Sequence, residues 1–141
     1  MDIYEELVMR YLCDGKSSVF VCPNFRVTGG WSFPDFVVLD FKKGARKEKV
    51  VSVVEVTTNK NPLRLIEKVE KRNIQWLVKL KEQLHRSQVV DDSWKYMVEV
   101  FVREDAAKKF HEKFDGQTDV KIHILDEKVL NCWKWDWTER E

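Results

Sequence analysis

The chain has 141 residues, of which 43% are hydrophobic, and a formal net charge of +1 at pH 7. A chain of this length buries roughly two thirds of its unfolded surface, which predicts a single compact domain over residues 1–141 with a hydrophobic core. No apolar run approaches the ~18 residues that span a bilayer, and the start lacks the basic and apolar segments of a signal peptide. We therefore expect an intracellular protein that is not secreted and has no membrane partner.

The cysteines and histidines argue against two common kinds of site. The three cysteines are an odd number without close pairing, which indicates reduced thiols rather than a disulfide framework or a zinc knuckle. The three histidines are scattered and show no His-x-x-x-His spacing.

Positive charge is concentrated in the middle of the chain. Residues 41–90 contain 13 Lys or Arg against 5 Asp or Glu. Such a segment is typical either of solvated loops and helix faces or of a surface that follows phosphate groups.

The first predicted elements are a helix and an edge strand. Residues 2–13 repeat apolar side chains at the i, i+4 spacing of an amphipathic helix. Residues 18–27 predict a strand that Pro23 interrupts, and therefore one that lies at an edge or is kinked. Two glycines and Trp31 follow, and the Trp31 ring either packs on the core or stacks on a base.

Two acidic strands form the predicted centre of the sheet. Asp35, directly after a proline, precedes the apolar run 36–39, and Glu55 lies near the end of the apolar run 50–57. An antiparallel pairing through the basic turn near Gly44 brings both carboxylates to the same edge. Because hard divalent cations bind through one or two carboxylates plus phosphate and water, this edge is a candidate cation site.

A long helix and two further strands complete the predicted domain. Asn61 and Pro62 suit the N-cap and first position of a helix whose apolar stripe includes Ile74 and continues to Leu84. A strand over 94–102, a short helix over 106–114 that Asp105 can cap, and a strand over 120–125 follow. The last residues carry three tryptophans at period two, which could stack bases, meet a partner subunit or cover the sheet.

The Pro34-Asp35 and Glu55-Val56-Thr57 segments resemble the PD-(D/E)XK nuclease superfamily. In that family an Asp after Pro opens one strand, and an acidic residue stands two positions before a Lys on the next strand. Thr57 occupies the position of that Lys. The order Pro-Asp, Glu, Thr and then Lys on the following helix is similar to that of influenza-type cap-snatching endonucleases, and the glycine-containing loop is similar to one in Holliday-junction resolvases.

The resemblance implies roles for further residues. A Lys recruited from elsewhere would replace Thr57, and Lys60, Lys68 and Lys71 are the candidates, with Lys71 preferred. Glu5 of the first helix would add a metal ligand, as would the main-chain carbonyl of Val56.

The resemblance also implies a fold and a function. The expected architecture is a restriction-endonuclease-like α/β sandwich, in which helices flank a central mixed β-sheet, with an αβββαβ core followed by a C-terminal helix and strand. The expected activity is that of a nuclease in which Asp35 and Glu55 hold Mg²⁺ or Mn²⁺ and in which Trp31, Arg64 and Lys68 contact DNA or RNA.

Two other interpretations remain open. The chain could be an inactive nuclease-fold module that binds nucleic acid or a protein, or Asp35 and Glu55 could be unrelated surface acids that lie far apart. Because so small a chain has no separate targeting domain, we expect a homodimer or a subunit of a larger complex.

Overall fold

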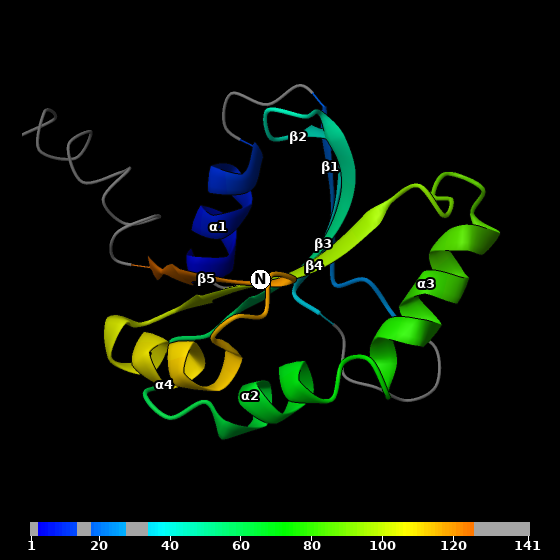
Figure 1. Ribbon diagram of the computed structural model, residues 1–141. Coiled ribbons are helices and arrows are strands. Elements are labelled where there is room, and N and C mark those ends of the chain that lie inside the picture. Colours follow the sequence, from blue (N-terminus) through cyan, green and yellow to red (C-terminus); the bar gives the residue numbers. More distant parts are fainter. Residues whose placement is uncertain (1–2, 14–17, 28–33, 126–141) are drawn as a thin grey trace, which may run out of the picture.

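The computed structural model describes residues 3–13, 18–27 and 34–125, which form an α/β fold (Figure 1). A five-stranded sheet in the order β1-β2-β3-β4-β5 is combined with four helices. No described helix is both long and apolar enough to cross a membrane. In chain order the elements are α1 Ile3–Cys13, β1 Val19–Pro23, β2 Phe36–Lys43, β3 Glu48–Val56, α2 Leu63–Glu70, α3 Trp76–Arg86, β4 Lys95–Val102, α4 Glu104–Phe114 and β5 Val120–Ile124.

The sheet is mixed, as the sequence predicted. β1, β2 and β3 pair antiparallel, whereas β3, β4 and β5 pair parallel. β1 is the edge strand of the sheet and ends at Pro23. Proline is tolerated in an edge strand because its missing N–H removes no hydrogen bond between strands.

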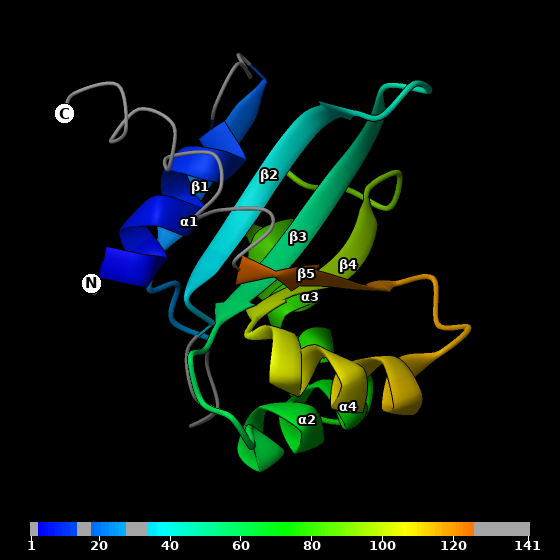
Figure 2. The same cartoon turned by 90° about the vertical axis from the view of Figure 1, so that its left-hand side faces the viewer.

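Helices cover both faces of the sheet (Figures 1 and 2). On one face, apolar side chains of β2, β3 and β4 pack against α2, α3 and α4. On the other face, Val8 and Leu12 of α1 pack against Phe36, Val54 and Phe101. Because both faces are covered, the central strands are near-continuous apolar runs rather than alternating ones.

The single long helix predicted after Pro62 is wrong. The structure has two helices, α2 and α3, separated by a turn over residues 71–75. Ile74, assigned to the apolar stripe, is 81% exposed. Instead, Arg72 in the turn is buried, and it donates to the carbonyl of Val69 at 2.7 Å. The side chain that points inward here is thus a guanidinium that finds polar partners, which periodicity of apolar residues cannot detect.

Two predicted helix caps are also wrong. The N-cap of α2 is Pro62, and Asn61 instead accepts a hydrogen bond from Lys109 of α4. The N-cap of α4 is Arg103, and Asp105 lies in the first turn, where it forms an ion pair with that arginine. An acid in the first turn still suits the helix dipole.

Candidate functional site

The two acidic residues singled out from the sequence lie together at one edge of the sheet. β2 and β3 run antiparallel with Phe36 opposite Val54. Asp35 precedes β2 and therefore lies beside Glu55. The main-chain N–H of Val56 donates to Oδ2 of Asp35 at 2.7 Å. This is also the edge at which the parallel strands β3 and β4 end, the usual location of ligand sites in open α/β sheets.

Asp35 holds a proton near neutral pH. Burial raises its pKa from 3.8 to about 8, together with a hydrogen bond to Glu5 and the negative charge of Glu55. The Val56 N–H opposes this rise, and Glu55 accepts a hydrogen bond from Asp35. Glu5 of α1 is thus the third acid at the site, and the proton on Asp35 relieves the repulsion among three carboxyl groups.

A lysine from α2 faces the second carboxylate. Nζ of Lys68 lies 2.5 Å from Oε1 of Glu55, whose residue is 8% exposed. Burial raises the pKa of Glu55, and the charge and hydrogen bond of Lys68 act against that rise. Because both side chains are largely enclosed, water screens this ion pair less than it screens a surface pair.

The other two candidate lysines lie elsewhere. Lys71, the preferred candidate, pairs instead with Glu67, with Nζ 2.6 Å from Oε1 and both side chains exposed. Lys71 lies away from the site because α2 ends before it and Lys71 is the C-cap residue. Lys60 is exposed in the loop between β3 and α2. The geometry therefore favours Lys68 as the lysine of this site.

Thr57 shapes the loop that leads from the site to α2. Its N–H donates to the carbonyl of Phe101 at 3.0 Å, and its hydroxyl accepts the N–H of Asn59 at 3.2 Å. A short hydroxyl that binds the backbone two residues on is a common turn device. Thr57 thus has a structural contact of its own at the position where the resemblance expects a lysine.

The remaining predicted contacts have different outcomes. Val56 contacts Asp35 through its N–H, and a role for its carbonyl stays a prediction. Arg64 is exposed in the first turn of α2. Trp31 lies outside the described residues, as do the three tryptophans near the end of the chain.

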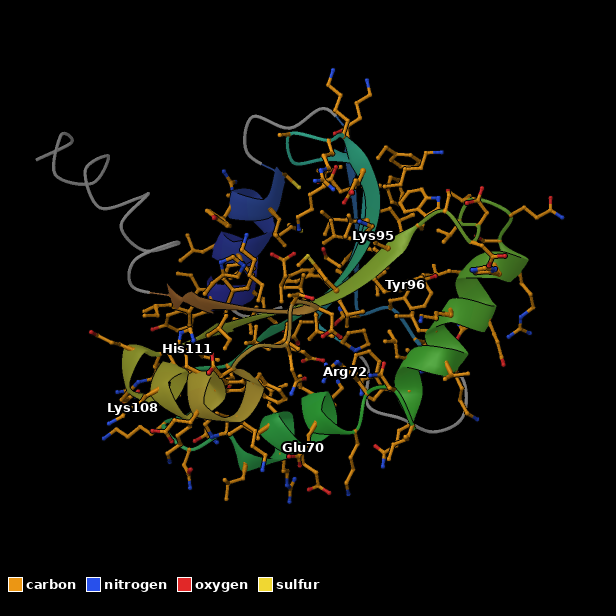
Figure 3. All side chains as sticks on the ribbon, viewed as in Figure 1. Glu70, Arg72, Lys95, Tyr96, Lys108 and His111 are labelled. Carbon is orange, nitrogen blue, oxygen red and sulfur yellow. The ribbon has the colours of Figure 1, made fainter. Side chains whose placement is uncertain are left out.

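Contacts from distant parts of the chain fix the position of α2. Nζ of Lys113 in α4 lies 2.8 Å from Oε2 of Glu70. Arg72, just after α2, donates through Nε and Nη2 to both carboxylate oxygens of Asp119 at 2.9 Å. Arg72 lies on the side of the turn nearer the sheet, whereas Glu70 lies on the outer side of α2 (Figure 3). Bidentate pairs of this kind are strong and directional, so the helix that carries Lys68 is held firmly.

Basic side chains lie on the loop and helices next to the carboxylates. Within the described ranges, Lys60, Arg64 and Lys108 have no acidic ion-pair partner. Lys109 binds the uncharged Asn61, with Nζ 2.5 Å from Oδ1. Lys108 lies at the outside of α4 (Figure 3). Unneutralised positive charge on the loop and helices that follow the two acidic residues is suited to attracting a phosphate-bearing ligand.

The described residues contain no group of three or more His, Cys, Asp or Glu side chains already arranged around a metal position. Magnesium does not require one, because it commonly binds through one or two carboxylates and completes its shell with water and substrate phosphate. Asp35 and Glu55 supply oxygen donors of the right kind, and the proton on Asp35 occupies a place where positive charge is favourable.

A second buried polar cluster lies on the face of the sheet that α1 covers, and sequence reasoning missed it. Glu99 and His123 are each 4% exposed, with Nε2 of His123 2.9 Å from Oε1 of Glu99. Nζ of Lys43 lies 3.1 Å from Oε2 of Glu99 and 3.3 Å from Oγ of Ser52. The four residues border a cavity of about 80 Å³. The available signal was a lone carboxylate inside the apolar run 94–102.

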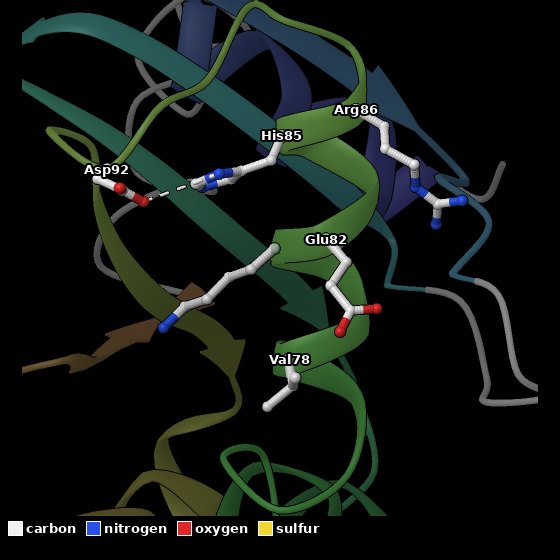
Figure 4. A pocket seen from close by; sticks show the side chains of 6 residues that line it. Val78, Glu82, His85, Arg86 and Asp92 are labelled. Carbon is white, nitrogen blue, oxygen red and sulfur yellow. Dashed lines mark ion pairs between the residues drawn. The ribbon is translucent and has the colours of Figure 1, made fainter.

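A shallow hollow runs along α3 (Figure 4). His85 and Asp92 face each other across it, with Nδ1 3.8 Å from Oδ1. Its lining mixes both signs of charge, and none of its residues belongs to the carboxylate site. The hollow therefore adds no chemistry to that site.

No family model, curated protein or solved structure matches this chain. A functional proposal for this chain therefore rests on the geometry of its own residues.

Proposed function

We propose that the chain is a divalent-metal-dependent nuclease of the PD-(D/E)XK type that hydrolyses phosphodiester bonds of DNA or RNA. The observation that carries the proposal is the constellation of Asp35, Glu55 and Lys68, in which the half-buried acid that precedes β2 and the buried acid of β3 meet a lysine from the next helix. The third interpretation of the sequence, unrelated acids far apart, does not agree with this arrangement.

Asp35 and Glu55, with Glu5 beside them, would hold Mg²⁺ or Mn²⁺. A bound cation would supply an activated water and neutralise charge on the scissile phosphate. The fit rests on the chemistry of the donors, because three carboxyl groups in contact bind a proton at a pH where isolated carboxylates do not.

The protein groups have separable roles in this proposal. The Lys68 ammonium would leave Glu55 in part to neutralise a phosphate oxygen or to orient the attacking water, the task of the lysine that Thr57 replaces. The backbone N–H of Val56 would keep the Asp35 carboxylate in position. Lys60, Arg64, Lys108 and Lys109 would bind flanking phosphates.

The test is cleavage of labelled single-stranded and duplex DNA and RNA with Mg²⁺, Mn²⁺ or EDTA. Wild type is compared with Asp35→Asn and Glu55→Gln, which keep the side-chain shapes and remove the charges. Glu48→Gln, which changes an acid of β3 that pairs with the exposed Lys95, is the matched control. Cutting that needs metal and both acids of the site, and that survives Glu48→Gln, supports the proposal. Metal-independent cutting, or full activity without either acid, would contradict it.

A second candidate is a nuclease-fold module that binds nucleic acid or a protein without cutting. The observation that favours it is that Thr57 stands at the position of the family's lysine and that its hydroxyl is bonded within a turn. Retention of a labelled nucleic acid that is unchanged by Glu55→Gln, with no cleavage in any metal, would select this function.

A further inference from the structure

The turn that interrupts the predicted long helix brings a buried tryptophan against Lys68. Trp76, the first residue of α3, is 2% exposed. Its indole N–H donates to the main-chain carbonyl of Lys68 at 2.9 Å. Nζ of Lys68 lies 5.8 Å from the centroid of the same ring. One side chain therefore contacts Lys68 at both its backbone and its ammonium group.

These contacts bring a second group to the Lys68 ammonium besides Glu55. The Lys68 ammonium is bonded to Glu55 and lies within the range of a cation–π interaction with Trp76. The ring and the carboxylate thus both interact with the ammonium group. Lysine has four rotatable bonds and loses much rotamer freedom when it is fixed, so a second contact narrows the positions it samples.

The hydrogen bond to the Lys68 carbonyl also has a geometric role. α2 ends two residues after Lys68, and the carbonyls of the last helical turn lack intrahelical partners. The indole N–H satisfies one of these carbonyls and fastens the end of α2 to the start of α3. In a single continuous helix, a main-chain N–H of the next turn would bond this carbonyl, and the Trp76 side chain would not be the donor.

We propose that Trp76 is a positioning residue that holds the Lys68 ammonium at the carboxylate pair. This inference rests on the proposed function, in which Lys68 acts on the phosphate or the water. It assigns to the turn over residues 71–75 the task of changing the chain direction between α2 and α3, so that Trp76 at the start of α3 reaches Lys68.

The test uses the full chain with two graded substitutions and a matched control. Trp76→Phe keeps a ring and removes the N–H, whereas Trp76→Leu removes both contacts. Trp94→Phe is the control, because Trp94 is also buried and its indole N–H has no hydrogen-bond partner among the described residues. Melting curves of all three variants establish which of them fold.

Two readouts report on Lys68 rather than on general packing. The first is the extent of amine acylation at Lys68, measured by mass spectrometry relative to Lys71 in the same molecule. The second is the separation of kcat from KM in the cleavage assay. The first readout needs no activity, so it tests the positioning of Lys68 even if the chain cuts no nucleic acid and the proposed function fails.

We expect Trp76→Leu to raise relative acylation of Lys68 about threefold or more and to lower kcat about tenfold with KM nearly unchanged, as befits loss of a partly buried cation–π contact. Trp76→Phe is expected to lie between wild type and Trp76→Leu. If the leucine variant does not fold, the phenylalanine variant decides. Folded Trp76 variants whose Lys68 acylation and kcat equal those of Trp94→Phe would overturn the inference.

Discussion

Lys68 of α2 and Glu55 of β3 form a largely enclosed ion pair, with Nζ 2.5 Å from Oε1, although the position predicted for that lysine by the nuclease pattern is Thr57. The sheet supplies the carboxylate, and the following helix supplies the ammonium group from thirteen residues further along the chain. The pair links the end of β3 to α2. Substitution of Lys68 therefore tests whether the pair serves catalysis.

Lys68→Met is expected to lower cleavage about 10²-fold or more, because loss of one preorganised charge at a developing anion typically has an effect of this size. Methionine keeps most of the stem that packs near Trp76. Lys71→Met, three residues away and paired with exposed Glu67, is the control and should retain nearly full activity. Rates under single-turnover conditions measure the difference. The reverse result, loss in Lys71→Met alone, would restore the preference derived from the sequence.

Asp35→Asn is expected to stabilise the protein at alkaline pH. Burial and the neighbouring Glu5 and Glu55 raise the pKa of Asp35 to about 8, so between about pH 4 and 8 the folded state binds more protons than the unfolded state. Stability therefore falls as pH rises through this window. Asparagine cannot ionise, so the variant does not lose this stability as pH rises. We expect Tm of the variant to exceed that of wild type by about 3 °C or more at pH 9. The advantage should vanish below pH 4, and a constant difference across pH would contradict this account.

Much of the fold was predictable because its determinants are local. Asp35 and Glu55 each lie at the end of a β-rich run, and a short hairpin leaves only one plausible pairing between those runs. The choice of lysine depended on the end of α2, where Arg72 turns inward to Asp119, a partner 47 residues away. No local pattern carries that information. Glu99 was missed for the same reason, since its partners Lys43 and His123 come from other strands.

Affinity for divalent cations is expected to increase with pH up to about 8. A cation must displace the proton on Asp35, so binding releases protons and weakens as the pH falls below the pKa. The Mn²⁺-induced rise in Tm at fixed metal concentration should be larger at pH 8.5 than at pH 6. Asp35→Asn should abolish the shift, because the amide lacks the charge. A shift of equal size in Asp35→Asn would place the cation elsewhere in the molecule.

Glu99→Gln is expected to destabilise the protein through the second polar cluster. Burial alone raises the pKa of Glu99, but the hydrogen bond from His123 and the charge of Lys43 outweigh burial and lower it to about 2. A carboxylate whose pKa is depressed stabilises the fold above its unfolded pKa of 4.5, and this contribution is lost as pH falls toward 2.

Removing one partner of a buried ion pair leaves the others unpaired, so we expect Glu99→Gln to lower the free energy of unfolding by about 3 kcal/mol at pH 7. Urea unfolding at pH 7 and at pH 3 measures the change, which should shrink at the lower pH because wild type then loses part of the same contribution. Glu48→Gln, which breaks an exposed pair with Lys95, serves as the control with little expected effect. Equal destabilisation by the two substitutions would mean that the buried contacts of Glu99 contribute no more to the free energy of unfolding than the exposed pair does.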